Sequence, residues 1–138
     1  MREAVLAIIK ANNERTVFNA LGMEVTQVDA DETIVSLTID QRHFQHVGLV
    51  HGGIYVLLAE SAASIAGACT LTSPDQTIVA LEINANHVRS SRTGTLTATS
   101  KCLHRGKKTL VYEVRVEDGE QRLISMARCT LMVIEPKR

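Results

Sequence analysis

Two parts of the chain carry residues that could act on a substrate: the segment His51-Gly52-Gly53 and the glutamate at position 60. A helix N-terminus has unsatisfied backbone N–H groups and a positive dipole end, which suit a developing negative charge on an oxygen. Glycine at that point lets a substrate come close to the backbone. A plainer interpretation is that Gly52 and Gly53 only begin a tightly packed helix.

Glu60 is a single acid in an otherwise apolar or small-residue stretch. A carboxylate buried in such a stretch is costly unless it has partners or takes up a proton. Such a group suits general-base work, and desolvation sharpens it as a nucleophile. The competing interpretation is an acid that faces a solvent channel or pairs with an arginine across an interface.

Both features belong to one predicted helix. Apolar residues recur at helical spacing at Ile54, Leu57, Leu58, Ala62 and Ile65, and alanine and serine fill much of the remainder up to Cys69. A helix with apolar or small residues nearly all round is expected to be enclosed on most sides. At about 24 Å it is too short, and at Glu60 too polar, to span a membrane.

The remaining chain predicts short helices and long strands around that helix. Before the helix we expect helical turns at Glu3–Lys10 and at 17–21, the second ended by Gly22, and β-branched strands at 23–29 and 32–40. After the helix, four strands are predicted at 77–90, 94–104, 108–117 and 121–134. Their separators are short enough for antiparallel hairpins. The expected fold is a single α+β domain of residues 1–138 whose antiparallel sheet curls around the helix.

Composition narrows the classes of partner. The fifteen basic and fifteen acidic side chains cancel, so bulk charge gives no support for a nucleic-acid or membrane partner. The three cysteines contain no CxxC pair and lie in apolar contexts, which favours reduced thiols in a cytoplasmic protein. An edge strand as long as those predicted invites pairing with a second chain, so we expect an oligomer.

At this point the motifs resemble a known family. Gln45, His51-Gly52-Gly53 and the segment Glu60-Ser61-Ala62-Ala63-Ser64 resemble the HGG…E…S signature of hotdog-fold acyl-CoA thioesterases. The likeness is to the PaaI-like branch, which includes the Arthrobacter-type 4-hydroxybenzoyl-CoA thioesterase and the enterobactin proofreading thioesterase. It continues through the blocks LEINANHVRSSRTG, CLHRGKKTLVYEV and ARCTLMVI. The resemblance implies a curled sheet around the helix, and a homodimer that assembles into a homotetramer with its sites between subunits.

The resemblance also implies roles for individual residues. The Gly52 N–H would be the oxyanion donor, with His51 and Gln45 orienting the thioester. Glu60 would be the general base or the nucleophile. Ser64, one helical turn later, would help to place Glu60 or a water, although a small residue that allows close packing is an equal alternative.

Further likeness concerns the coenzyme A part of the substrate. His87 matches a histidine near the thioester, while Val88 departs from the family and leaves the acyl preference open. Because CoA carries phosphates, its site needs cations or backbone donors. The resemblance places it near Arg89 and Ser90 and near the turn that contains Gly106 and Lys107, although solvated hairpin charges are a plainer explanation there.

The predicted function is hydrolysis of an aromatic or medium-chain acyl-CoA, without a metal or organic cofactor. The five histidines show no clustered metal-ligand spacing. A non-catalytic acyl-CoA binding module and a thioesterase for an acyl- or aryl-carrier protein are the alternatives. A hotdog dehydratase of 3-hydroxyacyl thioesters is disfavoured because no His/Asp hydratase pair is visible.

Overall fold

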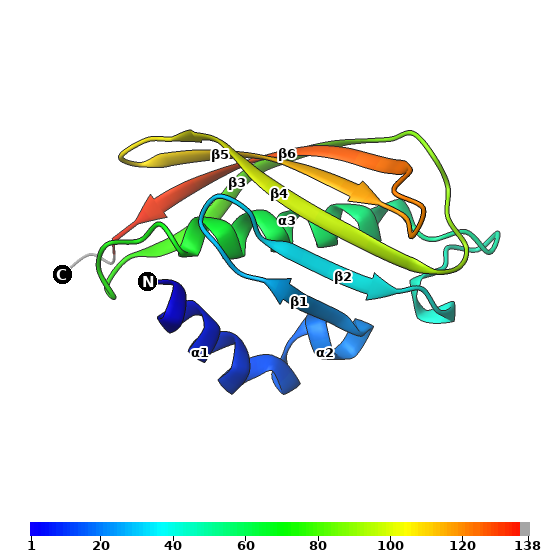
Figure 1. The fold of residues 1–138 in the computed structure, drawn as a ribbon, viewed down its shortest axis with the longest axis horizontal. Coiled ribbons are helices and arrows are strands. Elements are labelled where there is room, and N and C mark those ends of the chain that lie inside the picture. Colours follow the sequence, from blue (N-terminus) through cyan, green and yellow to red (C-terminus); the bar gives the residue numbers. More distant parts are fainter. Residues whose placement is uncertain (136–138) are drawn as a thin grey trace.

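A computed structural model describes residues 1–135. At its centre lies α3 (Gly52–Ala68), a helix of 17 residues, with a six-stranded antiparallel sheet curled against it (Figure 1). This arrangement confirms the α+β architecture of a curled sheet around one long helix. The enclosure is incomplete: seven residues of α3 are buried, while Glu60, Ser61 and Ser64 remain half-buried.

The elements fall close to their expected positions, and most strands are shorter than predicted. Before α3 come α1 (Arg2–Asn12), a 3-10 turn (Asn13–Arg15), α2 (Val17–Leu21), β1 (Met23–Gln27), β2 (Ile34–Thr38) and a second 3-10 turn (Gln41–His43). After α3 come β3 (Thr77–His87), β4 (Thr95–Arg105), β5 (Thr109–Glu117) and β6 (Leu123–Ile134). Gly22 ends α2 in the left-handed conformation, with φ of 69°, as expected of a glycine C-cap.

The strand order corrects one prediction. The sheet runs β1-β2-β4-β5-β6-β3, so β4–β5 and β5–β6 are hairpin neighbours as expected. The predicted β3–β4 hairpin is wrong. β3 instead pairs with β6 at one edge of the sheet, and β4 pairs with β2. The outer side of β3 therefore has no strand partner within residues 1–135.

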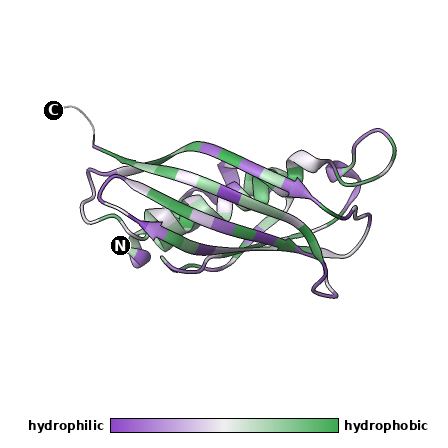
Figure 2. Cartoon of the chain, turned by 90° about the horizontal axis from the view of Figure 1, so that it is seen from above, coloured by the Kyte–Doolittle hydropathy of each residue, from purple (hydrophilic) through white to green (hydrophobic). Residues whose placement is uncertain are grey.

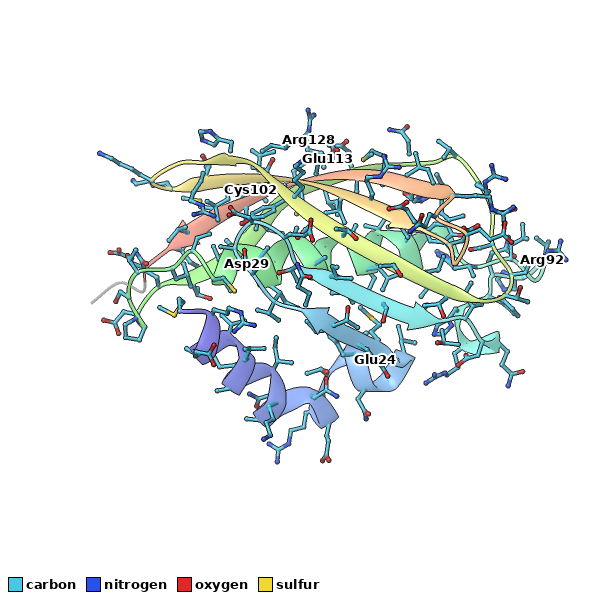
Figure 3. All side chains as sticks on the ribbon, in the orientation of Figure 1. Glu24, Asp29, Arg92, Cys102, Glu113 and Arg128 are labelled. Atoms are coloured by element: carbon cyan, nitrogen blue, oxygen red, sulfur yellow. The ribbon has the colours of Figure 1, made fainter. Side chains whose placement is uncertain are left out.

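The core lies between α3 and the concave face of the sheet. Alternate residues of the central strands point inward and are buried, as the two-residue period of a strand requires. Those with under 2% exposure include Leu96, Leu110, Tyr112, Ile124 and Leu131. The strands change between apolar and polar residues along their length (Figure 2). The outer face carries charged pairs such as Glu113 and Arg128, which lie opposite each other on β5 and β6 (Figure 3).

Gly67 shows how closely α3 packs on the sheet. A Cβ at this position would lie 2.5 Å from Leu131 Cδ1 and 3.4 Å from Leu110 Cδ1. We expect Gly67→Val to lower the free energy of unfolding by about 1–3 kcal/mol, since overpacking a tight core strains its neighbours. Urea unfolding at fixed protein concentration would measure this loss. Gly119→Ala is the control because nothing lies within 4 Å of its added Cβ; equal midpoints for the two variants would contradict the prediction.

Candidate active site

The N-terminus of α3 presents backbone donors, as predicted. The His51 side chain caps the helix, its Nδ1 accepting a 2.8 Å hydrogen bond from the Gly53 N–H. Since Nδ1 is the acceptor, the neutral ring carries its proton on Nε2, and His51 is exposed. No acceptor among residues 1–135 takes the Gly52 N–H. The start of α3 thus offers an unpaired backbone donor beside a capping imidazole.

The loop before α3 brings Gln45 to the same region. Phe44 and Val50 form an isolated antiparallel bridge, and the Gln45 N–H donates to the Leu49 carbonyl at 2.8 Å. The Gln45 side-chain oxygen accepts a hydrogen bond from the Val47 N–H. Its amide NH₂ therefore remains available as a donor for a substrate.

His43 anchors this loop, a role that the sequence did not reveal. Its side chain is fully buried; Nδ1 accepts from the Asp40 N–H at 2.9 Å, and Nε2 then donates to the Leu21 carbonyl at 2.8 Å. Its carbonyl accepts the His51 N–H at 2.8 Å. His43 therefore fixes where α3 begins and has no ring nitrogen left for a ligand.

His87 lies directly against the helix N-terminus. Its Nε2 and Cδ2 are 3.0 Å from the point that a Cβ on Gly52 would occupy, so only glycine fits there without displacing the ring. Its ring packs edge-on against Tyr55, with centroids 5.1 Å apart. On the other side, Nδ1 lies 2.8 Å from the hydroxyl oxygen of buried Ser125. The predicted contact region of His51, Gly52 and His87 is thus assembled within one chain.

Two of the residues that hold this arrangement were missed by the sequence analysis. The Tyr55 hydroxyl lies 2.5 Å from the Ser91 hydroxyl, which joins α3 to the segment after β3. Ser125 stands opposite His87 in the β3–β6 register. Tyr55 lies four residues after His51, about one helical turn, and this spacing could have placed both residues at the start of the same helix. No sequence pattern identifies Ser125 as a site residue, because its position opposite His87 is known only from the strand pairing.

The Glu60 side chain is half-buried and forms no hydrogen bond or ion pair with any of residues 1–135. Burial raises the pKa of the Cys129 thiol to about 12, and the negative charges of Glu60 and Glu82 add to this shift. The Glu60 carboxylate is therefore near Cys129 of β6. Ser64, one turn further on, is also half-buried, and its hydroxyl forms no hydrogen bond with the Glu60 carboxylate.

Within one chain, the two halves of the predicted catalytic set are apart. Glu60 follows Gly52 by eight residues in a continuous helix, which places the two backbones about 12 Å apart along its axis. A carboxylate on one side of the helix does not reach a thioester held at the N-terminus over that distance. Gly52, His51 and His87 form one group, with Gln45 in the loop that leads to it, and Glu60 and Ser64 lie further along the helix.

The residues predicted to hold CoA are also divided. Arg89 and Ser90 are exposed and follow β3, where Val50 donates to the carbonyl of the adjacent Ser91 near the start of α3. Gly106 and Lys107 lie in the β4–β5 turn and line a hollow with Thr70, just past the end of α3. The two sets thus lie at opposite ends of α3.

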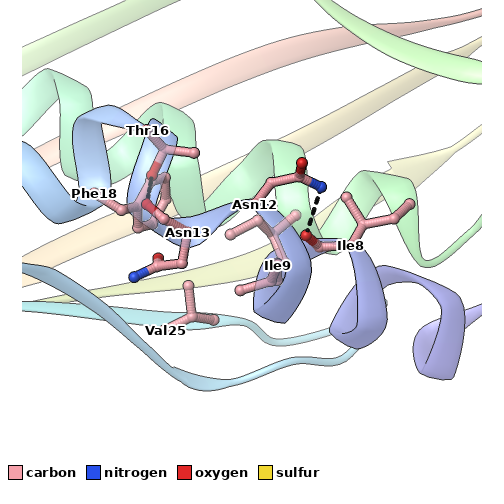
Figure 4. Close-up of a pocket in the computed structure, with 8 residues that line it drawn as sticks. Ile8, Ile9, Asn12, Asn13, Thr16, Phe18 and Val25 are labelled. Carbon is pink, nitrogen blue, oxygen red and sulfur yellow. Dashed lines mark hydrogen bonds between the residues drawn. The ribbon is translucent and has the colours of Figure 1, made fainter.

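Two apolar cavities lie between α1 and α3. One, of about 170 Å³, is lined by Ile8, Ile9, Phe18, Val25 and Ile65, with Asn12, Asn13 and Thr16 also at its wall (Figure 4). The other, of about 300 Å³, is lined by Ile8, Ser64 and Ile78 among others. No charged side chain of residues 1–135 lines either one. Ile8 borders both, and Ser64 places the second beside the turn of α3 that follows Glu60.

Within 1–135, no group of three or more His, Cys, Asp or Glu side chains is arranged to hold a metal ion. None of the helices in that range is long and apolar enough to cross a membrane. Cys69, Cys102 and Cys129 are free thiols, and only Cys129 is buried.

Known proteins of one family resemble this chain in sequence and in fold. The chain matches the family model of the thioesterase superfamily over residues 47–125. It is 39% identical over 118 residues to 1,4-dihydroxy-2-naphthoyl-CoA hydrolase of Listeria monocytogenes, a match that covers 86% of this chain and 95% of that protein. It is 32% identical over 133 residues to the proofreading thioesterase EntH of Klebsiella pneumoniae, which covers 96% of each chain. A solved thioesterase structure from Haemophilus influenzae has a TM-score of 0.85 and 32% identity, covering 93% of this chain and 88% of that one.

Proposed function

The chain belongs to the thioesterase superfamily, and from that premise we propose that it hydrolyses aromatic or medium-chain acyl-CoA to the free acid and CoA. The observation that carries the proposal is the unpaired Gly52 N–H at the capped start of α3, beside His51 and His87. A thioester carbonyl bound there gains a backbone donor where its negative charge develops. Gln45 supplies a second, side-chain donor.

In this proposal Glu60 is the general base or the nucleophile, and it comes from a second subunit. The distance of about 12 Å from Gly52 along α3 supports that arrangement, because one chain cannot bring both to a thioester. β3 also has an open edge of eleven residues that can pair with its symmetry mate. We therefore propose a homodimer, with Ser64 helping to place Glu60 or the attacking water, and a homotetramer and cytoplasmic location remain predictions.

CoA itself would lie near the segment after β3. Arg89 is exposed there and can pair with a phosphate, and Ser90 can donate a hydrogen bond. Gly106 and Lys107 could meet the same CoA only from another subunit, because they lie at the other end of α3. CoA is part of the substrate, and the proposed reaction uses no further cofactor.

The cavities between α1 and α3 are lined mainly by apolar side chains and by no charged side chain of residues 1–135, which supports an apolar acyl group. Ile8 borders both, so Ile8→Trp is expected to lower kcat/KM for a C8 or C10 acyl-CoA by about tenfold and to leave a C4 ester nearly unchanged. Ala11→Trp is the matched control, because Ala11 is exposed on α1, as Ile8 is, but lines neither cavity. Equal losses on all chain lengths, or no loss with the Ile8 variant, would contradict this location.

Thiol release from a panel of thioesters tests the function. Benzoyl-, hydroxybenzoyl-, phenylacetyl- and dihydroxynaphthoyl-CoA would be compared with straight chains and with the same acyl groups on a carrier protein. The names of two relatives, a dihydroxynaphthoyl-CoA hydrolase and a proofreading thioesterase, support including both aromatic and carrier-bound esters. Turnover of carrier-bound esters alone would favour the carrier-protein alternative. Tight CoA-ester binding without turnover would instead indicate a binding module.

A further inference from the structure

The polar contacts around His87 favour one of the two tautomers of its ring. Ser125 has one hydroxyl hydrogen, and its oxygen donates it to the Asn86 carbonyl at 3.3 Å. The same oxygen lies 2.8 Å from His87 Nδ1. Ser125 can bond both neighbours at once only when its hydroxyl hydrogen goes to the Asn86 carbonyl and the His87 Nδ1–H donates to a lone pair of Ser125.

That tautomer leaves Nε2 of His87 without a proton. The tautomer of a neutral histidine is set by the bond that its other nitrogen makes. Nε2 is the atom that lies 3.0 Å from the position of a Cβ on Gly52, and the His87 side chain is open to solvent. The unprotonated Nε2 of His87, a hydrogen-bond acceptor, therefore lies beside the unpaired N–H of Gly52 at the start of α3.

The environment keeps this ring from turning. Ser125 is 1% exposed and faces His87 across the β3–β6 pair, and the Tyr55 ring covers one edge of the imidazole. Tyr55 is itself tied to Ser91 through its hydroxyl. A ring held on two sides presents Nε2 in one direction.

We propose that Ser125 is a positioning residue that fixes His87 in the Nδ1–H tautomer, so that Nε2 accepts a hydrogen bond from an N–H or O–H donor of the thioester substrate. The donor can be an amide N–H of the pantetheine arm or a hydroxyl on the acyl group close to the carbonyl. The role rests on the proposed thioesterase function only for its kinetic part; the tautomer itself is a property of the free protein.

The first measurement is the tautomer of His87 in the ¹⁵N-labelled protein, by long-range ¹H–¹⁵N correlation at a pH where the ring is neutral. We expect a protonated Nδ1 and an unprotonated Nε2, and a signal in which these two are exchanged would overturn the proposal. In Ser125→Ala the fixed tautomer should be lost, and Ser125→Thr should restore it because the hydroxyl returns. This readout does not need turnover, so it separates failure of the proposal from failure of the thioesterase function.

A matched control exists on another strand. Ser100 is also fully buried and exchanges hydrogen bonds with Thr33, at 3.0 and 3.2 Å, away from His87. Ser100→Ala should cost stability without changing the His87 signals. Equal changes in both alanine variants would assign the effect to general loosening and overturn the specific role.

Kinetics then identify the donor. With Ser125→Ala, kcat/KM should fall about tenfold, as expected for one lost hydrogen bond, with recovery in Ser125→Thr. An equal fall for benzoyl-CoA and 2-hydroxybenzoyl-CoA would support a pantetheine N–H, and a larger fall for the hydroxylated ester would support the acyl hydroxyl. Unchanged kcat/KM for both esters would overturn the substrate contact.

Discussion

Glu60→Gln is expected to lower kcat by about 10³-fold while leaving the fold intact. Glutamine keeps the shape of the side chain and removes the group that abstracts a proton or attacks the thioester, a loss that typically costs 10²–10⁴-fold. Stability should change little, because the Glu60 side chain forms no hydrogen bond or ion pair with residues 1–135. The measurement is thiol release on the best ester of the panel, together with urea unfolding.

Glu82→Gln is the matched control for this result. Glu82 also lies close enough to add to the raised pKa of Cys129, but it is exposed on the edge strand β3. It should retain near wild-type kcat. A well-folded Glu60→Gln protein within tenfold of wild type would exclude Glu60 as base or nucleophile. Single turnover in H₂¹⁸O adds detail, since label on the Glu60 carboxyl would show the nucleophilic route.

The central helix could be predicted because local sequence determines it. The stretch from Ile54 has helical periodicity, and the structure extends the helix back to Gly52, where the His51 side chain caps it. Gly22 was predictable as a C-cap for the same reason, since its left-handed conformation is a local preference of glycine. Each of these features depends on neighbours within a few residues.

Strand pairing was predictable only where the chain turns back at once. The β3–β4 hairpin was wrong because β3 ends at His87 rather than at 90, which leaves residues 88–94 as a connection. Seven residues can span about 23 Å, and crossing β6 and β5 to reach β4 needs three strand spacings, about 14 Å. Because the end of β3 was predicted three residues too late, the crossover connection from β3 to β4 was not recognised.

The wrong pairing of β3 also prevented the prediction of one residue beside the site, Ser125. Ser125 faces His87 only because β3 pairs with β6, and no spacing in the sequence joins residues 38 positions apart. Gly52 and Glu60, by contrast, were recognised from one short segment. Their separation of about 12 Å follows from the eight-residue spacing once the helix between them is known to be continuous.

Subunit complementation is the strongest test of a shared site. Glu60→Gln and Gly52→Pro are each expected to be inactive alone, because proline has no N–H to donate to the thioester carbonyl and fits the first turn of a helix. The His87 ring beside Gly52 makes a folding check of that variant necessary, and Gln45→Ala serves as a second donor variant. In a mixed dimer, one site contains both substitutions and the other contains neither.

Refolding an equal mixture of the two variants should therefore restore about a quarter of wild-type activity. Random pairing makes half of the dimers mixed, and each mixed dimer holds one intact site of two. Steady-state thiol release against the mixing ratio measures the recovery, which should be greatest at equal amounts. Mixing the same two variants without refolding controls for slow exchange. Activity that stays at the level of the separate variants, with mixed dimers verified by mass, would place Glu60 and Gly52 in the same subunit's site and would require α3 to break between them.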